Sequence, residues 1–302
     1  MSKKTKKSLG VGWIILIIFT ALACFGLLIA SIVKGKNIAL FNPQGYIANE
    51  QHKLMLTIVA ILLAVAIPVL LIAYSIAWKY RESNIKAVTT PTKNKGKSHA
   101  FVMWIVPVTI MVMIVSVMLP ATYRLAPQKT LADDKNILKI KVISLRWKWL
   151  FIYPDQGIAT VNFVQIPVNT AVEFEMTADE TPMSSFWIPN LGGQLYTMTS
   201  HVNRLNLLAD TTGDYPGSTP EINGIGFSGM RFIARVSNND DFLQWVQSVE
   251  QSPKQLDSEA YEQLLKPSER NPVAYYSTFK DDLYDKVLMK YNGHSEGQMY
   301  NL

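Results

Sequence analysis

Two long uncharged apolar runs, residues 54–78 and 100–123, constrain the fold of this chain more than any other feature. Neither run contains an Asp, Glu, Lys or Arg residue. Each is longer than the roughly 20 residues that a helix needs to cross a hydrocarbon core about 30 Å thick. Lipid offers the backbone no hydrogen-bond partners, so we expect helices even though Pro68 and Pro107 lie within the runs. The sequence therefore predicts transmembrane helices at residues 54–78 and 100–121, forming a membrane hairpin; two buried helices of a soluble protein are the alternative.

The distribution of charge predicts how this hairpin is oriented. The first ten residues contain four lysines and no acid, and residues 79–99 contain six basic residues and one acid. From Ala121 to the end there are 16 basic and 21 acidic residues. Basic residues collect on the cytoplasmic side of a membrane, so residues 79–99 form a cytoplasmic loop and the domain after Ala121 lies outside, which in a bacterium is the periplasm. The large domain has no basic stripe interleaved with aromatic residues, so we expect no nucleic-acid partner.

The N-terminal segment, residues 1–33, is a third apolar stretch behind four lysines, as in a signal peptide. We favour an uncleaved signal anchor, because the sequence stays apolar after Cys24. The alternative is a lipoprotein signal peptide that is cleaved before an acylated Cys24. Residues 34–53 are expected to form a short external connector, with a turn at residues 42–45.

After Pro120 the pattern changes to the period of two that is typical of β-strands. Apolar and polar residues alternate at residues 137–144, 171–177, 202–208 and 230–236, with turn-rich segments between them. We therefore expect residues 122–237 to form an antiparallel β-sandwich that lacks disulfides, since the one cysteine of the chain is Cys24. In the C-terminal extension, residues 238–302, helical spacing appears at residues 240–251, 257–265 and 280–290, with prolines between these segments.

The sandwich opens with an aromatic run in which Trp147, Trp149, Phe151 and Tyr153 occupy alternate positions. On a strand these side chains would all point to one face. Such a face is usually a packed core. The alternative is an aromatic relay or a docking patch for a partner.

This arrangement of two membrane spans followed by a β domain with a Trp-x-Trp run resembles subunit II of the haem–copper respiratory oxidases. Residues 147–162 are similar to the run of the quinol-oxidising, cytochrome bo branch, and the resemblance extends from Asn42 to about Tyr291. It includes residues 185–189, 226–230 and 242–246. Aromatic residues of the C-terminal extension resemble the aromatic-rich extension of that branch: Trp245, Tyr261, Tyr275, Tyr276, Phe279 and Tyr284. The resemblance implies that the sandwich is all-β and cupredoxin-like, with Greek-key connections.

The resemblance also implies where a copper centre would lie. In the cytochrome c-oxidising branch, two copper ions are held by two Cys, two His, a Met and the backbone carbonyl of a Glu. Placed on this sequence, the His positions are Ser184 and Phe227 and the Cys positions are Thr219 and Asn223, while Glu221 and Met230 keep the family residue. Copper of this kind requires thiolate and imidazole ligands. We therefore expect no copper in this chain.

Other kinds of site have no support in the sequence. The four histidines, His52, His99, His201 and His294, form no ligand-like pair, so each is expected to be a surface or structural residue. A glycine-rich phosphate loop and a nucleophile elbow are both absent from the sequence. We therefore expect no catalytic, cofactor-binding or metal-binding residue in this chain.

One position departs from the family pattern near the membrane. The family typically has a Glu three or four residues before the Trp that opens the second span, where it is implicated in proton entry. Here that Trp is Trp104, and residues 100–103 are Ala, Phe, Val and Met. Histidine is the side chain whose ordinary pKa lies closest to neutral pH, so His99 could in principle relay protons instead; the simpler interpretation is a residue at the end of a loop.

The resemblance implies a non-catalytic subunit of a proton-pumping quinol oxidase that reduces oxygen to water in the bacterial inner membrane. The expected partners are the catalytic subunit I, which would hold the haems, the copper and the quinol site, together with small membrane subunits and lipid. Two alternatives remain: a copper-containing cytochrome c oxidase subunit II, and a membrane-tethered β domain with a binding or assembly role.

Overall fold

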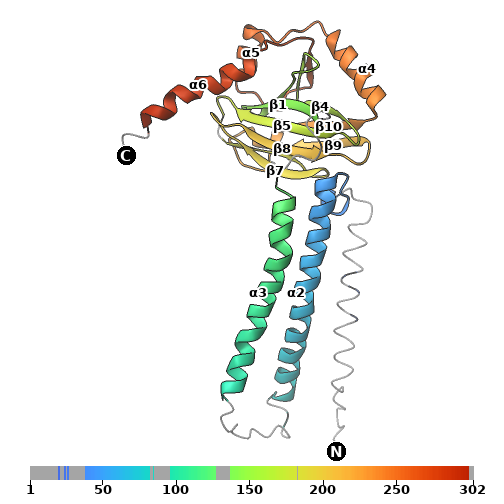
Figure 1. Ribbon diagram of the computed structural model, residues 1–302, viewed down its shortest axis with the longest axis vertical. Coiled ribbons are helices and arrows are strands. Elements are labelled where there is room, and N and C mark those ends of the chain that lie inside the picture. Colours follow the sequence, from blue (N-terminus) through green and yellow to red (C-terminus); the bar gives the residue numbers. More distant parts are fainter. Residues whose placement is uncertain are drawn as a thin grey trace, which may run out of the picture. The chain divides into compact units, whose positions relative to one another are not determined.

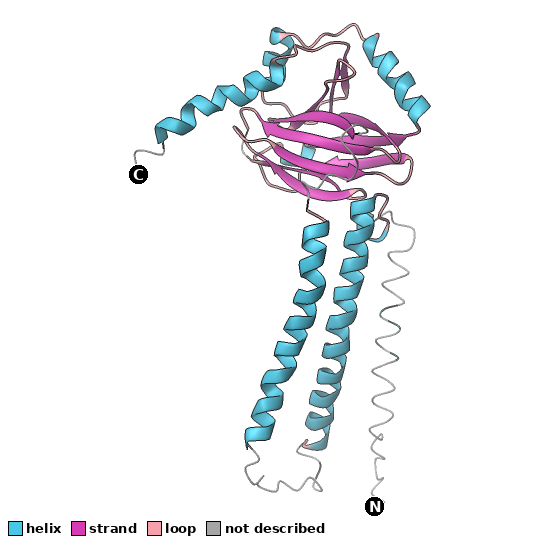
Figure 2. Cartoon of the chain, viewed as in Figure 1, coloured by secondary structure: helices cyan, strands magenta, loops and turns pink. Residues whose placement is uncertain are grey.

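The computed structural model describes residues 20, 24, 26, 38–81, 84, 96–126, 137–181 and 183–298, and the side chains of residues 96–100, 102, 103 and 292–298 lie outside that description. The chain divides into two compact units (Figures 1 and 2). The helical unit contains residues 1–38 and 55–119, and the β unit contains residues 39–54 and 120–302. The predicted signal anchor lies outside the described residues, apart from helical positions at Thr20, Cys24 and Gly26, of which Cys24 is an exposed free cysteine.

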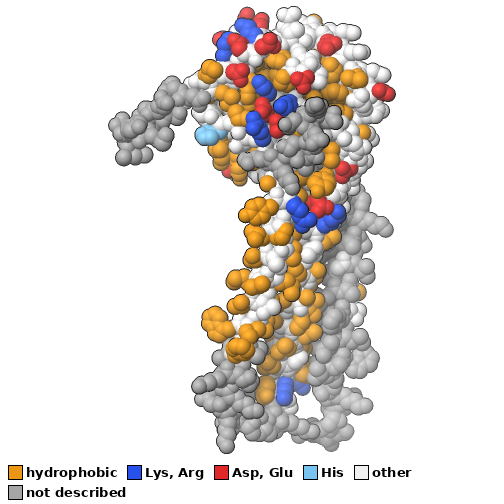
Figure 3. Space-filling model, viewed as in Figure 1, with side chains coloured by type: hydrophobic (Ala, Val, Ile, Leu, Met, Phe, Trp, Pro, Cys, Tyr) orange, Lys and Arg blue, Asp and Glu red, His pale blue; other side chains and the backbone are white. Residues whose placement is uncertain are grey.

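The two apolar runs form the long helices α2 (Tyr46–Lys79) and α3 (Gly96–Arg124). Both have the length and composition to cross a membrane, and hydrophobic side chains dominate their visible surface (Figure 3). Three hydroxyl groups within them donate to carbonyls of their own helix: Ser75 to Leu71 at 2.6 Å, Thr109 to Ile105 at 2.8 Å and Ser116 to Met113 at 2.8 Å. These polar groups are thus satisfied without water, as lipid requires. The prediction of two long apolar helices is confirmed.

The β unit is a sandwich of two sheets (Figure 2). One sheet has the strand order β11-β3-β2-β1-β5-β8 and the other has the order β4-β10-β9-β6-β7. Their strands are β1 (Ile137–Leu145), β2 (Lys148–Tyr153), β3 (Ile158–Val161), β4 (Phe163–Pro167), β5 (Ala171–Ala178), β6 (Ser184–Ile188), β7 (Gly192–Thr197), β8 (Asn203–Leu208), β9 (Gly213–Ser218), β10 (Arg231–Ser237) and β11 (Ala274–Tyr276). The predicted β-sandwich is confirmed.

The expectation that all strands would be antiparallel is wrong at two pairs. β1 and β5 are parallel over eight residue pairs, from Ile137 with Ala171 to Ser144 with Ala178. β4 and β10 are also parallel. Alternation of side chains gives the faces of a strand but not its direction, which depends on where the intervening chain crosses between the sheets.

The core between the sheets is rich in aromatic side chains. Trp149, Phe151 and Tyr153 of β2 are fully buried there, as the core interpretation of the aromatic run predicted. Phe186 of β6 stacks on Phe232 of β10 with ring centroids 5.0 Å apart, and Trp149 meets Phe186 edge-on at 5.2 Å. The first residue of the run differs, because β2 begins at Lys148 and Trp147 therefore lies outside the strand.

A second core lies on the other face of the six-stranded sheet, beneath the C-terminal extension. The extension contains α4 (Asn239–Glu250), α5 (Ser258–Leu265), the short strand β11 and α6 (Leu283–Gln298). Its side chains cover the outward residues of β1, β2 and β3; this core comprises Ile143, Leu145, Leu150, Ile152, Ala159, Val161, Leu256, Tyr261, Tyr276, Leu283, Tyr284 and Val287. β2 is therefore buried on both faces along its whole length.

The first turn of α2 belongs to the β unit, within the segment that the sequence predicted to be a connector. A short 3₁₀ helix, η1 (Ala39–Phe41), precedes it. The Gln44 amide donates to the Asn190 carbonyl at 2.7 Å, and the Asp210 amide donates to the Gln44 carbonyl at 2.9 Å. Ile47 is buried in the core between the sheets. The start of α2 is therefore held to the sandwich by these hydrogen bonds and by burial of Ile47, and the apolar span follows in the same helix.

Candidate functional site

Three connections meet at one end of the sandwich, which we call the loop end. They are the β1–β2 turn (residues 146–147), the β5–β6 loop (described at residues 179–181 and 183) and the β9–β10 loop (residues 219–230). β1 and β5 finish together because they are parallel and Ser144 pairs with Ala178. The backbone continues this pairing, since the Asp179 amide donates to the Ser144 carbonyl at 3.0 Å.

The residues that stand at the copper-ligand positions of the family come together at the loop end. The Asn223 side-chain amide donates to the Ser184 hydroxyl at 2.8 Å and contacts the Met230 sulfur at 3.2 Å. The Ser185 backbone amide donates to the Thr219 hydroxyl at 3.1 Å. All five residues are buried. Among the described atoms, Asn223 Oδ1 and Ser185 Oγ are buried without a hydrogen-bond partner.

The chemistry of this polar cluster does not fit a two-copper centre. Its donors are hydroxyl groups, one amide and one thioether, whereas copper centres of that kind need bridging thiolates and imidazoles. Phe227, at the second His position, starts the short 3₁₀ helix η3 (Phe227–Gly229) and is half-buried, as is Glu221. In the described part of the chain, no three His, Cys, Asp or Glu residues group as metal ligands would.

Trp147 packs against the β9–β10 loop from the β1–β2 turn. Its φ of 62° is in the left-handed region, which is unusual for a bulky residue and marks local strain. The indole Nε1 donates to the Asn223 carbonyl at 3.4 Å. A Cβ added to Gly226 would lie 2.4 Å from the indole Cδ2, so glycine is needed where the loop crosses the ring. The strained Trp thus holds the loop segment that carries Asn223.

The histidines take local roles where their side chains are described. The His52 ring nitrogen Nδ1 lies 2.8 Å from the Leu40 carbonyl, and that of His201 lies 3.1 Å from the Thr199 carbonyl. His99 is in the first turn of α3, but its side chain and that of His294 lie outside the described part of the chain.

Sequence reasoning missed the residues that tie the C-terminal extension to the loop end. Lys148 is 1% exposed, and its ammonium donates to the carbonyls of Leu264 at 2.7 Å and Lys266 at 2.8 Å. Burial lowers the pKa of Lys148 from its ordinary value. Asp179 is also buried and accepts hydrogen bonds from α5 and α6. A lysine in the aromatic run and an acid in a loop gave no signal of these contacts, which join residues about a hundred positions apart.

The chain is similar to known proteins in its C-terminal extension and over most of its length. The COX aromatic rich motif matches residues 250–295, which is most of the C-terminal extension. Cytochrome bo(3) ubiquinol oxidase subunit 2 of Pseudomonas putida is 41% identical over 281 residues, covering 93% of this chain and 88% of that protein. Ubiquinol oxidase subunit 2 of Acetobacter aceti is 38% identical, covering 88% and 87%. Among solved structures, the periplasmic domain of cytochrome oxidase subunit II of Bradyrhizobium japonicum is 22% identical, with a TM-score of 0.36, and covers 40% of this chain and 95% of that one.

Proposed function

The chain belongs to the family of subunit 2 of the cytochrome bo(3) ubiquinol oxidases, and on this premise we propose that it is the non-catalytic, copper-free second subunit of a proton-pumping quinol oxidase. The complex would oxidise quinol in the membrane and reduce oxygen to water. The observation that carries the copper-free part is the buried cluster of Ser184, Asn223, Met230 and Thr219 at the copper-ligand positions. Hydrogen bonds join the side chains of Ser184, Asn223 and Met230, and the Thr219 hydroxyl accepts one from the Ser185 backbone amide. Hydroxyl, amide and thioether groups are unsuited to binding two copper ions.

The role of this chain would be to dock on, stabilise and cap subunit I. Haem, copper and the quinol site would belong to that partner. Copper is dispensable here because quinol delivers electrons from within the membrane, whereas cytochrome c delivers them at the external surface. The exposed apolar residues of α2 and α3 support a position in the bilayer, where they would face lipid and the other membrane subunits.

The charge distribution supports a bacterial inner-membrane location with the cupredoxin-like domain, residues 122–237, and the C-terminal extension in the periplasm. Residues 1–33 would remain as a signal anchor. We interpret His99 as a residue where the cytoplasmic loop meets the first turn of α3; a proton relay that replaces the acid missing from residues 100–103 is the alternative.

Purification of the tagged full chain in gentle detergent tests this proposal. We expect a haem-containing large subunit to co-purify, with a visible haem spectrum, and the chain separated from that subunit to contain no stoichiometric copper. Recovery without any haem protein would contradict membership of an oxidase complex and favour a separate binding or assembly role. About two copper ions per separated chain would instead contradict the copper-free role and indicate a cytochrome c oxidase subunit II.

A further inference from the structure

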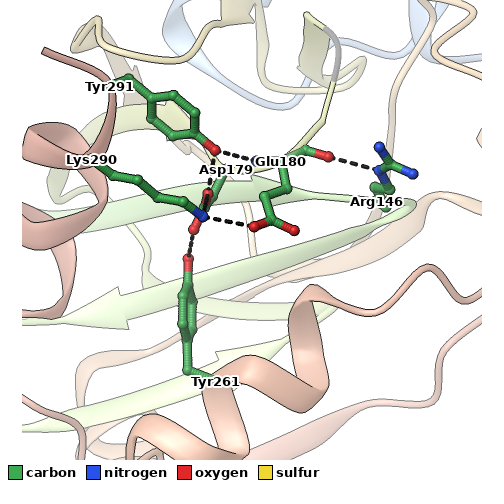
Figure 4. A network of polar contacts seen from close by, with 6 residues as sticks. All are labelled: Arg146, Asp179, Glu180, Tyr261, Lys290 and Tyr291. Carbon is green, nitrogen blue, oxygen red and sulfur yellow. Dashed lines mark hydrogen bonds and ion pairs between the residues drawn. The ribbon is translucent and has the colours of Figure 1, made fainter. Parts of the chain in front are cut away.

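The loop end is tied to the C-terminal extension at several independent places. The Asp179 carboxylate is the centre of the largest group of contacts (Figure 4). It is 1% exposed, and it accepts hydrogen bonds from the Tyr261 hydroxyl of α5 at 2.7 Å and the Tyr291 hydroxyl of α6 at 2.6 Å. The Lys290 ammonium lies 3.0 Å from the same carboxylate. One buried acid of the β5–β6 loop therefore joins two helices of the extension.

Glu180 extends this network to the β1–β2 turn. Its carboxylate pairs with Lys290 at 2.8 Å, and its backbone amide is 2.9 Å from the Tyr291 hydroxyl. The Arg146 Nε donates to the Glu180 carbonyl at 2.7 Å (Figure 4). Glu180 itself has a φ of 50°, a left-handed conformation that these contacts hold in place.

The segment that follows α5 crosses the β9–β10 loop. A Cβ added to Gly226 would lie 2.7 Å from Glu269 Cγ, and one added to Gly229 would lie 2.9 Å from Arg270 Cγ. The next residue, Asn271, accepts a hydrogen bond from the Asn162 side chain at 2.9 Å through its carbonyl. Residues 266–271 thus form a strap, which begins where Lys148 donates to the Lys266 carbonyl.

We propose that the C-terminal extension is an intramolecular clamp, which cross-links the three connections of the loop end and holds the Ser184–Asn223–Met230 cluster in one conformation without a metal ion. That no metal ion is needed rests on the proposed function, whereas the clamp rests on the contacts between the extension and the loop end. The β5–β6 loop leads into Ser184, and the β9–β10 loop carries Asn223 and Met230. A device that fixes both loops fixes the cluster. The extension contacts the β5–β6 loop through Asp179 and Glu180, and it contacts the β9–β10 loop through the strap.

Two lysines one turn apart on α6 give a matched pair of variants. Lys290 pairs with Asp179 and Glu180 of the loop end, whereas Lys286 pairs with Asp282 of its own C-terminal region at 2.6 Å. Substituting either by methionine keeps a long side chain and removes one charge. Tyr261→Phe removes the hydroxyl that donates to the Asp179 carboxylate and keeps the ring in the second core. The hydrogen bonds and ion pairs described here for these residues are with Asp179, Glu180 and Asp282.

The measurement is amide hydrogen exchange of the full chain in its detergent-purified complex. We expect Lys290→Met and Tyr261→Phe to accelerate exchange about tenfold at residues 179–185 and also at residues 223–230, while exchange within β1 and β5 stays at the wild-type rate. Lys286→Met should leave both loops unchanged. Equal effects of Lys290→Met and Lys286→Met, or faster exchange confined to residues 179–185, would overturn the clamp. Haem co-purification and copper content of the wild-type complex report separately on the proposed function, so the two failures are distinguishable.

Discussion

Gly192 is a single residue on which the junction between α2 and the sandwich depends. It has a φ of 92°, and a Cβ built on it would lie 2.7 Å from the Ala48 backbone nitrogen. The Ala48 amide donates to the neighbouring Leu191 carbonyl at 3.2 Å, so neither backbone can move away without breaking a contact. A residue without a side chain is needed here for two reasons, conformation and space.

Gly192→Ala should therefore destabilise the β unit more than Gly157→Ala. Gly157 also has a positive φ, 69°, but a Cβ there meets no atom within 4 Å. We expect about 1–2 kcal/mol for the conformational cost alone at Gly157, and a further 1–3 kcal/mol at Gly192 from the close contact. Thermal unfolding of the full chain in detergent measures both. Equal losses in the two variants would show that the contact with Ala48 relaxes freely.

At the scale of elements, the sequence predicted strands where apolar and polar residues alternate, and it missed strands such as β9 where they do not. β1 alternates over its first half, where Lys139 and Lys141 face outward, and was predicted from that pattern. In its second half Ile143 and Leu145 also face outward by the same alternation, and they can be apolar because the extension covers them. β9 contains Pro216 and two glycines and gave no strand signal. Alternation of apolar and polar residues predicts a strand from the local sequence. The alternation is lost where a distant segment, such as the C-terminal extension over β1, covers the outer face of the strand.

The sequence likewise predicted some residues of the candidate site and missed others. Ser184, Asn223 and Met230 could be placed together from the sequence, since their positions match those of a ligand set in the resembled family. Asp179 could not, because its partners Tyr261 and Tyr291 are 82 and 112 positions away and the acid resembles an ordinary loop residue. Its role appears only when α5 and α6 lie against the sheet.

The attachment of α5 and α6 should weaken at alkaline pH. Burial and the nearby Asp179 raise the pKa of Tyr261 and of Tyr291. Burial lowers the pKa of Lys290, but the hydrogen bonds that its ammonium donates to Glu180 and Asp179 outweigh burial and raise that pKa. In the unfolded chain these groups lose their protons near pH 10 to 10.5, while the folded chain keeps them. The unfolded state then binds fewer protons, so the free energy of unfolding falls as the pH rises above about 10.

Thermal unfolding of the full chain between pH 9 and pH 11 checks this expectation. Wild type should lose stability above about pH 10, and Tyr261→Phe should lose it less steeply, by about 1.4 kcal/mol per pH unit for the one missing titration. Tyr46→Phe is the control, because Tyr46 is an exposed residue at the start of α2, whereas the hydroxyls that donate to Asp179 come from α5 and α6. Parallel curves for wild type and Tyr261→Phe would contradict the sign worked out here.

At the scale of the whole molecule, the six-stranded sheet is a middle layer between two cores. The aromatic core joins it to the other sheet, and the second core joins it to the C-terminal extension. The extension contributes both a strand, β11, at the edge of this sheet and the polar contacts at the loop end. The β unit is therefore a sandwich whose outer face is completed by the last part of the chain.

Removing the extension after Glu250 should consequently unfold the β unit rather than leave an intact sandwich. The truncation uncovers the outward side chains Ile143, Leu145, Leu150, Ile152 and Val161. Exposure costs about 1.5–3 kcal/mol for each large aliphatic side chain, and the sum is comparable with the 5–15 kcal/mol that typically stabilises a domain. We expect the truncated chain to disappear from the purified oxidase complex, as measured by quantitative immunoblotting. A chain ending at Tyr291 keeps the contacts with Asp179 and should be recovered at the wild-type level. Recovery of the shorter chain with bound haem protein would show that the sandwich is stable without its second core.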